Sequence, residues 1–385
     1  MPAVVCARKG PWRSVLELRE TRPEPSASAM RSPPAPTQLD LAVAAAGVAF
    51  PDVLTVEGKH VRPLGQTPLV AGREVAGRVT AVGADAARAG FRVGDWVMAD
   101  SVNGGWADTA RVEMSTAHKF DPSRVDPRAA AGFALNYGTS YHALVHQGEL
   151  KRGETLLVLG ASGGVGSAAV EIGKALGAVV VACASSPDKL DICRRLGADH
   201  VVDYRSPAKM REEVERVTGG RAATKAQERG GVDVVFDPVG GAWSEPAMRL
   251  LRFGGRFLVL GFASGSDQPK SAIPRVPLNL ALLNERKICG VLFGTWRANN
   301  PDLDREAVRD LLRMMDRGDL RPHVESFPVA RWRDAVDALM GRRVVGKVVL
   351  AFDVAEEVGV AGRPVAGGRA ASPGVASDAP GPPRL

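Results

Sequence analysis

Apolar residues recur in two different patterns along the chain. Over about the first 125 residues they form short runs, some alternating with polar residues, and glycines interrupt these runs. This pattern is typical of β-strands joined by turns. A proline-rich segment, residues 20–36, predicts a loop between two of the strands. We expect these strands at Val4–Ala7, Leu39–Ala45, Glu74–Val82 and Asp95–Ala99.

Beyond Asp126 apolar runs alternate with segments of helical spacing. The expected strands contain apolar runs such as Val179–Val181. Such runs in a β-α series predict a parallel sheet with helices on both faces. Two helical segments, Pro127–Phe133 and Thr139–His146, come before the series. The series then runs through strand Thr155–Leu159, helix Val165–Leu176, strand Ala178–Cys183, helix Pro187–Leu196, strand His200–Asp203, helix Pro207–Val217, strand Val232–Phe236, helix Trp243–Leu251 and strand Gly255–Leu260.

The remaining segments are less regular. Residues 218–231 are polar and predict a surface insertion, and the tail after Phe352 is rich in proline and glycine without apolar periodicity, which predicts disorder. Between them we expect helices at Leu280–Asn284 and Arg305–Arg317 and extended segments at Pro322–Val329 and Gly346–Leu350.

Composition and charge narrow the class of protein. A chain of 385 residues with 45% hydrophobic and 24% charged residues fits a globular protein of two or three domains. The formal charge is +7, yet no run of five basic residues and no nucleic-acid-binding motif accompanies it. The absence of these features argues against nucleic acid as a partner, and an anionic cofactor is the simpler explanation for the basic excess.

Four cysteines are scattered without a CxxC pair, so the sequence predicts no metal site. Free thiols are typical of a reducing compartment, and we expect a cytoplasmic protein. No stretch reaches about 18 apolar residues, so we expect no membrane-spanning helix.

A glycine turn joins the first strand of the β-α series to its helix. Gly163 and Gly166 match the last two glycines of a dinucleotide fingerprint, and Ala161 stands where the first would be. Small residues let the backbone approach a pyrophosphate, and the helix N-terminus attracts its charge. A tight strand–helix turn without a ligand is the alternative. The residues assigned to the pyrophosphate are Ala161, Gly163, Gly164, Val165 and Gly166.

The next strand of the series indicates which dinucleotide binds. An NAD site places an acidic side chain at this strand end to bind the ribose. Here Ser185 and Ser186 occupy that place, and Lys189 follows one helical turn later. Two hydroxyls and an ammonium suit a 2′-phosphate, so we expect NADPH. Asp188 is interpreted as a helix first-turn residue, and a merely solvated Lys189 is the alternative.

Seven motifs occur along the chain in the order Gly47–Asp52, Gly72–Gly77, Val93–Val97, the 160–166 turn, Asp237–Gly241, Gly261–Gly265 and Gly346–Leu350. Together they resemble the zinc-independent quinone oxidoreductase (zeta-crystallin-like) branch of the medium-chain dehydrogenase/reductase superfamily, over residues 3–351. The resemblance implies an α/β fold, in which a Rossmann doubly wound parallel sheet is joined to a GroES-like β domain completed by the C-terminal segment. It also implies a homodimer or homotetramer. The implied parts are a GroES-like domain over 1–128, an NADPH-binding domain over 129–287, a return segment over 288–352 and a disordered tail over 353–385.

Two residues set the chain apart from the zinc enzymes of the superfamily. These enzymes carry a metal-ligating Cys at the position of Ala49 and a His at that of Arg73. Without a metal to polarise an alcohol, the resemblance implies hydride transfer to an electron-poor acceptor. Quinone reductases usually carry Asn at the position of Ala49, so a polar contact beside the nicotinamide is missing here.

The resemblance also assigns roles to individual residues. Phe50 would wall the nicotinamide cleft and Asp52 would order its loop, unless they are a core aromatic and a turn cap. Tyr137 would bond a ribose or acceptor oxygen, and is the one side chain considered as a proton donor, unless it is simply packed. His142 and His146 are spaced like a metal pair but lack a third ligand nearby. Further cofactor contacts are implied for Thr139, Tyr204, Gly261, Phe262, Ala263, Phe293, Gly294 and Lys347.

The sequence thus predicts an NADPH-dependent enzyme of the NADPH:quinone oxidoreductase type, which passes hydride to a quinone or an activated enone. Two alternatives stay open. A 2-enoyl thioester reductase shares the fold, but usually has a tyrosine in the first domain that residues 48–60 lack. A non-catalytic NADPH-binding protein, crystallin-like or RNA-binding, is consistent with the loss at Ala49.

Overall fold

A computed structural model of the chain describes residues 2–24, 30–60, 64–101, 104–220, 230–265 and 273–353. Part of the 20–36 loop and most of the 218–231 insertion lie outside the described residues. The tail predicted to be disordered also lies outside them from residue 354 onward.

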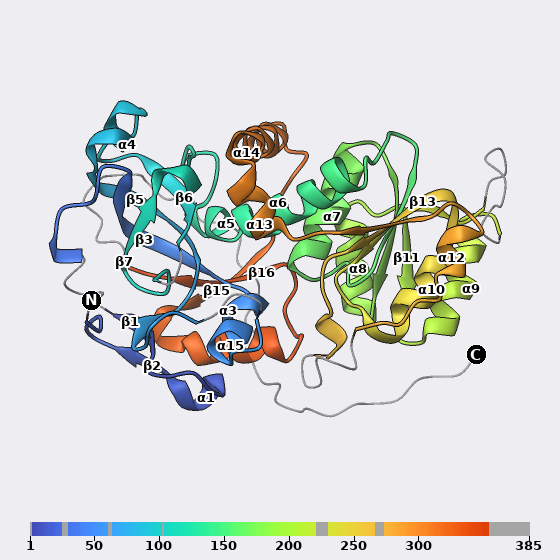
Figure 1. Cartoon of the computed structure of the whole chain (residues 1–385), viewed down its shortest axis with the longest axis horizontal. Coiled ribbons are helices and arrows are strands. Elements are labelled where there is room, and N and C mark those ends of the chain that lie inside the picture. Colours follow the sequence, from blue (N-terminus) through green and yellow to red (C-terminus); the bar gives the residue numbers. More distant parts are fainter. Residues whose placement is uncertain are drawn as a thin grey trace, which may run out of the picture. The chain divides into compact units, whose positions relative to one another are not determined.

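The parallel sheet has six strands in the order β11-β10-β9-β12-β13-β14 (Figure 1). The first three strands in sequence run outward in one direction from β9 and the last three in the other, which is the Rossmann order with its switch point between β9 and β12. The strands are β9 (Thr155–Val158), β10 (Val179–Ala184), β11 (His200–Asp203), β12 (Val232–Asp237), β13 (Leu251–Val259) and β14 (Lys287–Gly290).

Helices bury both faces of this sheet, as the apolar strands predict. Leu156 and Val158 of β9 belong to one apolar cluster with Ile172 of α7. Leu157 and Leu159 belong to a second cluster with Met210 of α9. Alternate side chains therefore point to opposite buried layers. The helices of this part are α7 (Gly164–Ala175), α8 (Pro187–Arg195), α9 (Pro207–Val217), α10 (Ser244–Arg249) and α12 (Asn279–Leu282).

The second large sheet is built from both ends of the chain. β16 pairs antiparallel with β3, with Val348 opposite Val48, so the C-terminal segment completes the N-terminal sheet. The order is β15-β16-β3-β5-β6-β8, and β7 pairs with β3. Its strands are β3 (Gln38–Val48), β5 (Glu74–Val82), β6 (Trp96–Asp100), β7 (Thr109–Glu113), β8 (Ala117–Lys119), β15 (Val324–Pro328) and β16 (Lys347–Ala351). A small sheet adds β1 (Ala3–Cys6), β2 (Leu16–Arg19) and β4 (Leu69–Val70).

The remaining helices lie outside the β-α series, and α5 and α15 among them pack on the second large sheet. The pattern of apolar residues predicted a helix over Thr139–His146, but α6 begins at Phe133 and passes at His142 into a π-helix. Such widened turns are frequent at functional sites. The helices are α1 (Trp12–Val15), α3 (Phe50–Val56), α4 (Ala84–Arg88), α5 (Pro127–Ala131), α6 (Phe133–Tyr141), the π-helix η2 (His142–Gln147), α13 (Phe293–Asn299), α14 (Pro301–Asp316) and α15 (Trp332–Met340).

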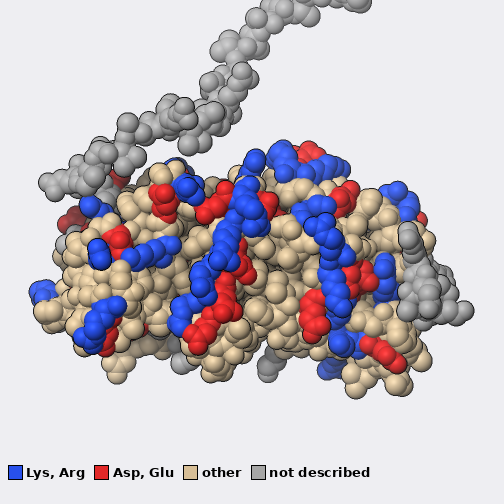
Figure 2. All heavy atoms as spheres, turned by 90° about the horizontal axis from the view of Figure 1, so that it is seen from above, with Lys and Arg blue, Asp and Glu red and all other residues tan. Residues whose placement is uncertain are grey.

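The surface charge is mixed rather than gathered into one patch on the face drawn in Figure 2, where basic and acidic side chains lie next to each other. On α14 each basic residue pairs with an acidic residue three positions earlier. These pairs are Asp302–Arg305, Glu306–Arg309 and Asp310–Arg313. The basic side chains of this helix are therefore locally balanced.

Candidate active site

The chain leaves β9 through a glycine turn and enters α7. Gly160 has a φ of +61°, so this glycine, rather than the position of Ala161, turns the chain. A Cβ on Gly166 would lie 2.2 Å from the Gly160 carbonyl oxygen, so α7 can approach the turn this closely only with glycine there. Gly163 caps α7 without a side-chain hydrogen bond. The first N–H groups of α7 therefore remain available for an anion.

Two other parts of the chain lie against this turn. The Gly346 N–H of the return segment donates to the Ser162 carbonyl at 3.0 Å, and Gly346 forms an isolated parallel bridge with Gly163. The Asn136 amide of α6 contacts Gly164, because a Cβ there would lie 2.5 Å from Nδ2. The turn is therefore enclosed by α6 and by the segment that returns to the β domain.

The end of β10 brings together two cations. Ser186 caps α8 and accepts a hydrogen bond from the Lys189 N–H at 3.5 Å, while Ser185 is exposed. Lys189 Nζ donates to the Arg342 carbonyl at 2.7 Å, and Arg342 Nη2 donates to the Ala263 carbonyl at 2.8 Å. Burial, together with the charge of Arg342, lowers the pKa of Lys189. Sequence reasoning missed Arg342, because it lies 153 residues from Lys189 and belongs to no motif.

Tyr204 lies on the same side of the glycine turn. Its hydroxyl is 3.9 Å from the position of a Cβ on Gly160. Trp243 Nε1 donates to the Tyr204 carbonyl at 2.7 Å, and the two rings lie 5.8 Å apart. Burial raises the pKa of Tyr204 to about 12, so the phenol stays neutral and keeps its proton to donate.

The loops after β12 and β13 lie beside each other at the carboxyl ends of these strands. The buried Asp237 accepts hydrogen bonds from two N–H groups of its own loop, at 2.8 and 2.9 Å. The Ala263 N–H donates to the Pro238 carbonyl at 3.1 Å, which ties the second loop to the first. Gly261 and Phe262 precede Ala263, and the Phe262 side chain is exposed. Ligands bind at this end of an open parallel sheet.

Tyr137 is packed inside the protein. Its ring stacks on Phe133 with centroids 4.5 Å apart, and its hydroxyl donates to Glu171. The other Glu171 oxygen accepts a hydrogen bond from the Arg321 N–H at 3.0 Å. Burial, then the neighbouring Glu171, raises the pKa of Tyr137 well above its usual range. These contacts favour the packed interpretation over a bond to the cofactor or acceptor.

Two of the helices that carry predicted cofactor contacts, α6 and α13, pack against each other. Phe293 packs on Gly138, where a Cβ would lie 2.6 Å from the ring, and Gly294 follows it on α13. Thr139 is half-buried, and its hydroxyl has no hydrogen-bond partner among the residues that the structure describes.

His142 and His146 form an aromatic group rather than a metal pair. The Trp296 ring stacks on His142 at 4.2 Å and lies 4.9 Å from His146. Burial, then the charge of His146, lowers the pKa of His142 to about 4. Both imidazoles are therefore neutral near pH 7, since burial also lowers the pKa of His146. The described residues contain no group of three or more side chains suited to a metal ion.

The loop before α3 is held by a buried carboxylate. Asp52 Oδ2 accepts a hydrogen bond from the Ala49 N–H at 2.8 Å, while Oδ1 is buried without a partner among the described residues. Burial raises the pKa of Asp52 to about 7, although the charges of Lys347 and Arg73 act in the opposite direction. Phe50 is half-buried at the start of α3. Whether it walls the nicotinamide stays a prediction.

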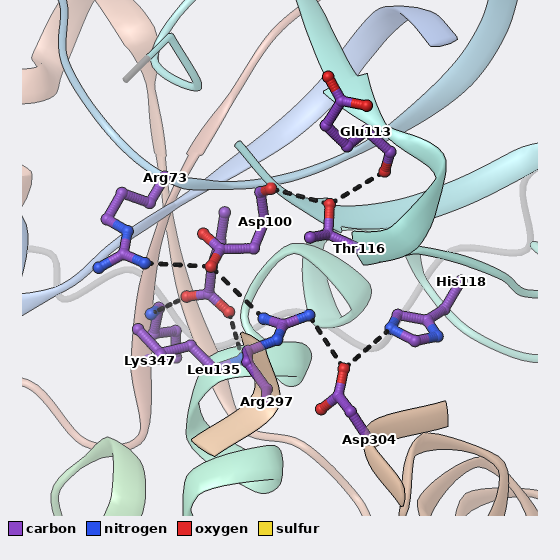
Figure 3. A network of polar contacts seen from close by, with 10 residues as sticks. Arg73, Asp100, Glu113, Thr116, His118, Leu135, Arg297, Asp304 and Lys347 are labelled. Atoms are coloured by element: carbon purple, nitrogen blue, oxygen red, sulfur yellow. Dashed lines mark hydrogen bonds and ion pairs between the residues drawn. The ribbon is translucent and has the colours of Figure 1, made fainter. Parts of the chain in front are cut away.

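Lys347 forms a buried ion pair with Glu74, and Figure 3 shows it beside the start of α6. The other Glu74 oxygen accepts a hydrogen bond from the Leu135 N–H at 2.7 Å. Lys347 directly follows Gly346, which bridges the glycine turn. Its ammonium is therefore committed to Glu74, and any contact of Lys347 with the cofactor stays a prediction.

A second charge network joins the β domain to α13 and α14 (Figure 3). Asp100 Oδ2 lies 3.1 Å from Arg73 Nη2 and 3.4 Å from Arg297 Nη1. Arg297 Nη2 lies 3.3 Å from Asp304, which is also 3.9 Å from His118. Burial, then the charge of Arg297, lowers the pKa of His118 to about 3, so His118 is neutral. Sequence reasoning noted Arg73 only as a lost metal ligand.

In the part of the chain that the structure describes, no helix combines the length and the apolar composition needed to cross a membrane.

Comparisons with known proteins place these features in a family. The chain matches the alcohol dehydrogenase GroES-like domain over residues 35–145 and the zinc-binding dehydrogenase domain over residues 164–316. It is 31% identical over 352 residues to quinone oxidoreductase-like protein 2 of Bos taurus, which covers 90% of this chain and 94% of that protein.

Two further similarities are to a protein solved with NADPH and to one part of a much longer protein. A mycobacterial protein solved in complex with NADPH is similar with a TM-score of 0.76 and 27% identity, over 91% of this chain and 100% of that one. The chain is also 32% identical over 321 residues to phthioceranic/hydroxyphthioceranic acid synthase of Mycobacterium bovis. That match covers 83% of this chain but only 14% of the synthase.

The fold and the relatives agree with the family that the sequence motifs indicate. The Rossmann strand order, the GroES-like sheet completed by β16 and the match to a quinone oxidoreductase-like protein along nearly its whole length confirm the predicted fold class. The chain therefore belongs to the zinc-independent quinone oxidoreductase branch of the medium-chain dehydrogenase/reductase superfamily, and is an enzyme of the oxidoreductase class.

Proposed function

We propose that the protein transfers hydride from NADPH to a quinone or to an alkene conjugated to a carbonyl group. The observation that carries this proposal is the pair of cations at the end of β10. Lys189 and Arg342 meet there beside two hydroxyls, Ser185 and Ser186, close to the glycine turn. This set suits a phosphate on the adenosine ribose, whereas an NAD site would place a carboxylate there.

The residues present fit the rest of NADPH as well. The N–H groups at the start of α7 would hold the pyrophosphate, and the loops after β12 and β13 lie at the ligand-binding edge of the sheet. Bound NADPH supplies a hydride. This chain would contribute orientation of the acceptor and exclusion of water.

The positions that carry zinc ligands in related enzymes hold Ala49 and Arg73 in this chain. This favours acceptors that take hydride without a Lewis acid. Quinones and enones meet this condition because their conjugated systems accept the electron pair. Stopped-flow reduction of a panel of quinones and enones by NADPH tests the activity. If no member is turned over while NADPH still binds tightly, the enzymatic proposal fails.

The cofactor choice has its own test. Titration of nicotinamide fluorescence gives Kd for NADPH and NADH. Lys189→Glu and Arg342→Ala should each weaken NADPH at least about tenfold, since each removes a charge-assisted contact with the 2′-phosphate, and should change NADH little. Arg343→Ala removes an exposed neighbouring cation and serves as the matched control. Equal losses for both cofactors would contradict a 2′-phosphate site.

A 2-enoyl thioester reductase is the second candidate, favoured by the match to phthioceranic/hydroxyphthioceranic acid synthase. The absence of a tyrosine from residues 48–60 argues against it. Comparing kcat/KM for a crotonyl thioester with that for quinones decides between them. An RNA filter-binding assay with NADPH as competitor tests the non-catalytic alternative.

For the assembly, we propose a homodimer formed through β14. Among the described residues β14 pairs only with β13, so its outer edge is open. On β14 and in the segments next to it in sequence, exposed apolar side chains are Leu278, Leu282, Leu283, Ile288 and Leu292. An unpaired strand of this kind readily adds another strand. Light scattering should give a dimer that Ile288→Lys dissociates, and a monomeric wild type would refute the interface.

For the location, we propose the cytoplasm. The four cysteines are all free, which fits a reducing compartment.

A further inference from the structure

Arg73 is a cation with a tightly fixed backbone on the β-domain side of the candidate active site. It follows Gly72, where a Cβ would lie 2.0 Å from the Trp106 ring, so the chain has no room to shift there. The Arg73 carbonyl accepts a hydrogen bond from the Ser101 N–H at 2.5 Å. The side chain therefore projects from a fixed point at the start of β5.

Only part of the Arg73 guanidinium is used by the protein. Nη2 lies 3.1 Å from Asp100, and Asp100 is held in turn by Arg297 (Figure 3). Among the described residues, Nε and Nη1 make no hydrogen bond, and the side chain keeps 13% of its surface exposed. A guanidinium has five N–H donors, and buried donors are normally satisfied. Arg73 is thus oriented at one end and has free donors at the other.

Arg73 is connected with parts of the candidate site on both sides. The adjacent Glu74 pairs with Lys347, the residue after the one that bridges the glycine turn. Arg73 is also close enough to Asp52, which holds the loop before α3, for its charge to act on the pKa of that carboxyl group. Arg73 is therefore next in sequence to the ion pair that joins β5 to the return segment, and near the residue that orders the loop carrying Phe50.

We propose that Arg73 binds the oxygen of the hydride acceptor and stabilises the negative charge that develops on it. This inference rests on the proposed function and adds a specificity to it, namely acceptors that become oxyanions. When hydride adds its electron pair to the β-carbon of an enone, a C–H bond forms and the C=C pair shifts to make an enolate oxygen. A proton from water then completes the saturated ketone. With a quinone, the hydride forms an O–H bond at one carbonyl oxygen, the ring electrons shift, and the other oxygen becomes a phenolate that a proton from water converts into the hydroquinone.

The free N–H groups of Arg73 suit such an oxygen better than the neutral ketone, because a charge-assisted hydrogen bond is stronger than a neutral one. Donors aimed at a developing oxyanion contribute about 10²–10³ in kcat. Arg73 itself cannot supply the proton, since a guanidinium stays charged at all ordinary pH values.

The experiment uses 4-nitrophenol as an oxyanion probe, because its absorbance separates phenol from phenolate. The protein with oxidised NADP⁺ bound should bind the phenolate at least about tenfold more tightly than Arg73→Gln does, since the variant lacks the charge-assisted contact. The double variant Arg73→Gln/Asp100→Asn should show the same loss, because it removes both charges of this pair while Arg297 keeps its ion pair with Asp304. Arg78→Gln removes a cation further along β5 and is the matched control.

The same variants separate a catalytic from a structural role. Arg73→Gln and the double variant should lower kcat for quinones and enones about 10²–10³-fold. Kd for NADPH and the melting temperature of the double variant should stay close to those of the wild type. Arg73→Lys should recover part of the phenolate affinity, because it restores the charge but not the forked geometry.

Two results would count against different claims. If the double variant keeps phenolate affinity and turnover within about threefold of wild type, the role of Arg73 is refuted and the proposed function stands. If the wild type binds no NADPH or reduces no acceptor, the proposed function fails instead. The phenolate titration, repeated without cofactor, then still shows whether Arg73 binds an oxyanion.

Discussion

The pair formed by Lys347 and Glu74 offers a direct test of how the two sheets are held together. Both side chains are almost fully buried, with 6% and 3% of their surfaces exposed. Lys347→Met keeps a chain of the same length up to Cε but removes the ammonium. The Glu74 carboxylate would then keep only the hydrogen bond from Leu135, at 2.7 Å. Breaking a buried pair in this way costs about 3–5 kcal/mol.

The surroundings offer little to replace the lost ammonium. The Lys347 charge also lowers the pKa of Asp52, so removing it raises that pKa further and favours the neutral form of Asp52. Replacing both partners, as in Glu74→Gln/Lys347→Met, removes the uncompensated charge. The glutamine oxygen can still accept from Leu135, and we expect the double variant to recover to within about 1–2 kcal/mol of wild type.

Urea unfolding followed by circular dichroism at pH 7 provides the measurement. We expect the midpoint of Lys347→Met to fall clearly, with the double variant between it and wild type. The reasoning is refuted if Lys347→Met costs less than about 1 kcal/mol, or if the double variant is as unstable as the single one.

Three further predictions follow from single side chains. Tyr137→Phe removes the hydroxyl that donates to Glu171 and should cost about 1–3 kcal/mol in unfolding experiments, with kcat unchanged; a fall in kcat without a loss of stability would make Tyr137 catalytic. Burial raises the pKa of Asp52 from 3.8 to about 7, so the unfolded chain loses this proton first and stability falls as pH rises from about 4 to 7, by at most about 1.4 kcal/mol per unit. Asp52→Asn should remove this fall in thermal melts, and an unchanged slope would contradict the assignment. Gly166→Ala forces a Cβ to within 2.2 Å of a carbonyl and should cost about 1–3 kcal/mol and weaken NADPH binding, whereas Gly290→Ala, with open space around it, should do neither.

Local patterns were sufficient for the parallel sheet but not for the shorter elements of the β domain. The strands of the β-α series carry apolar runs because both faces of the sheet are buried, so their pattern is strong. Strands β7 and β8 have only five and three residues, and α3 has seven. The residues of β7 and β8 form no continuous apolar run, so pairing with β3 and β6 decides the conformation of these two strands.

The residues of the candidate site also differ in how well the sequence predicts them. The glycine turn was predictable because steric constraints act between neighbours in sequence, as at Gly166 and Gly160. Tyr137 was not, since a tyrosine beside a cofactor and one bonded to a buried carboxylate look alike in a sequence. Glu171, which decides between them, lies 34 residues away on α7. Arg342 was missed for the same reason, because only the fold brings it to Lys189.

Charge compensation by distant residues explains why the sequence showed Arg73 only as the replacement of a metal ligand. A lone arginine in a half-buried position would cost free energy, so its presence requires a partner that the sequence does not reveal. That partner, Asp100, lies 27 residues away, and Arg297, which shares it, lies 197 residues further. Three charges that would each be unfavourable alone therefore form one network, anchored on α14 through Asp304. Because this network satisfies only one end of the Arg73 guanidinium, the position that carries a zinc ligand in related enzymes keeps a positive charge with free donors.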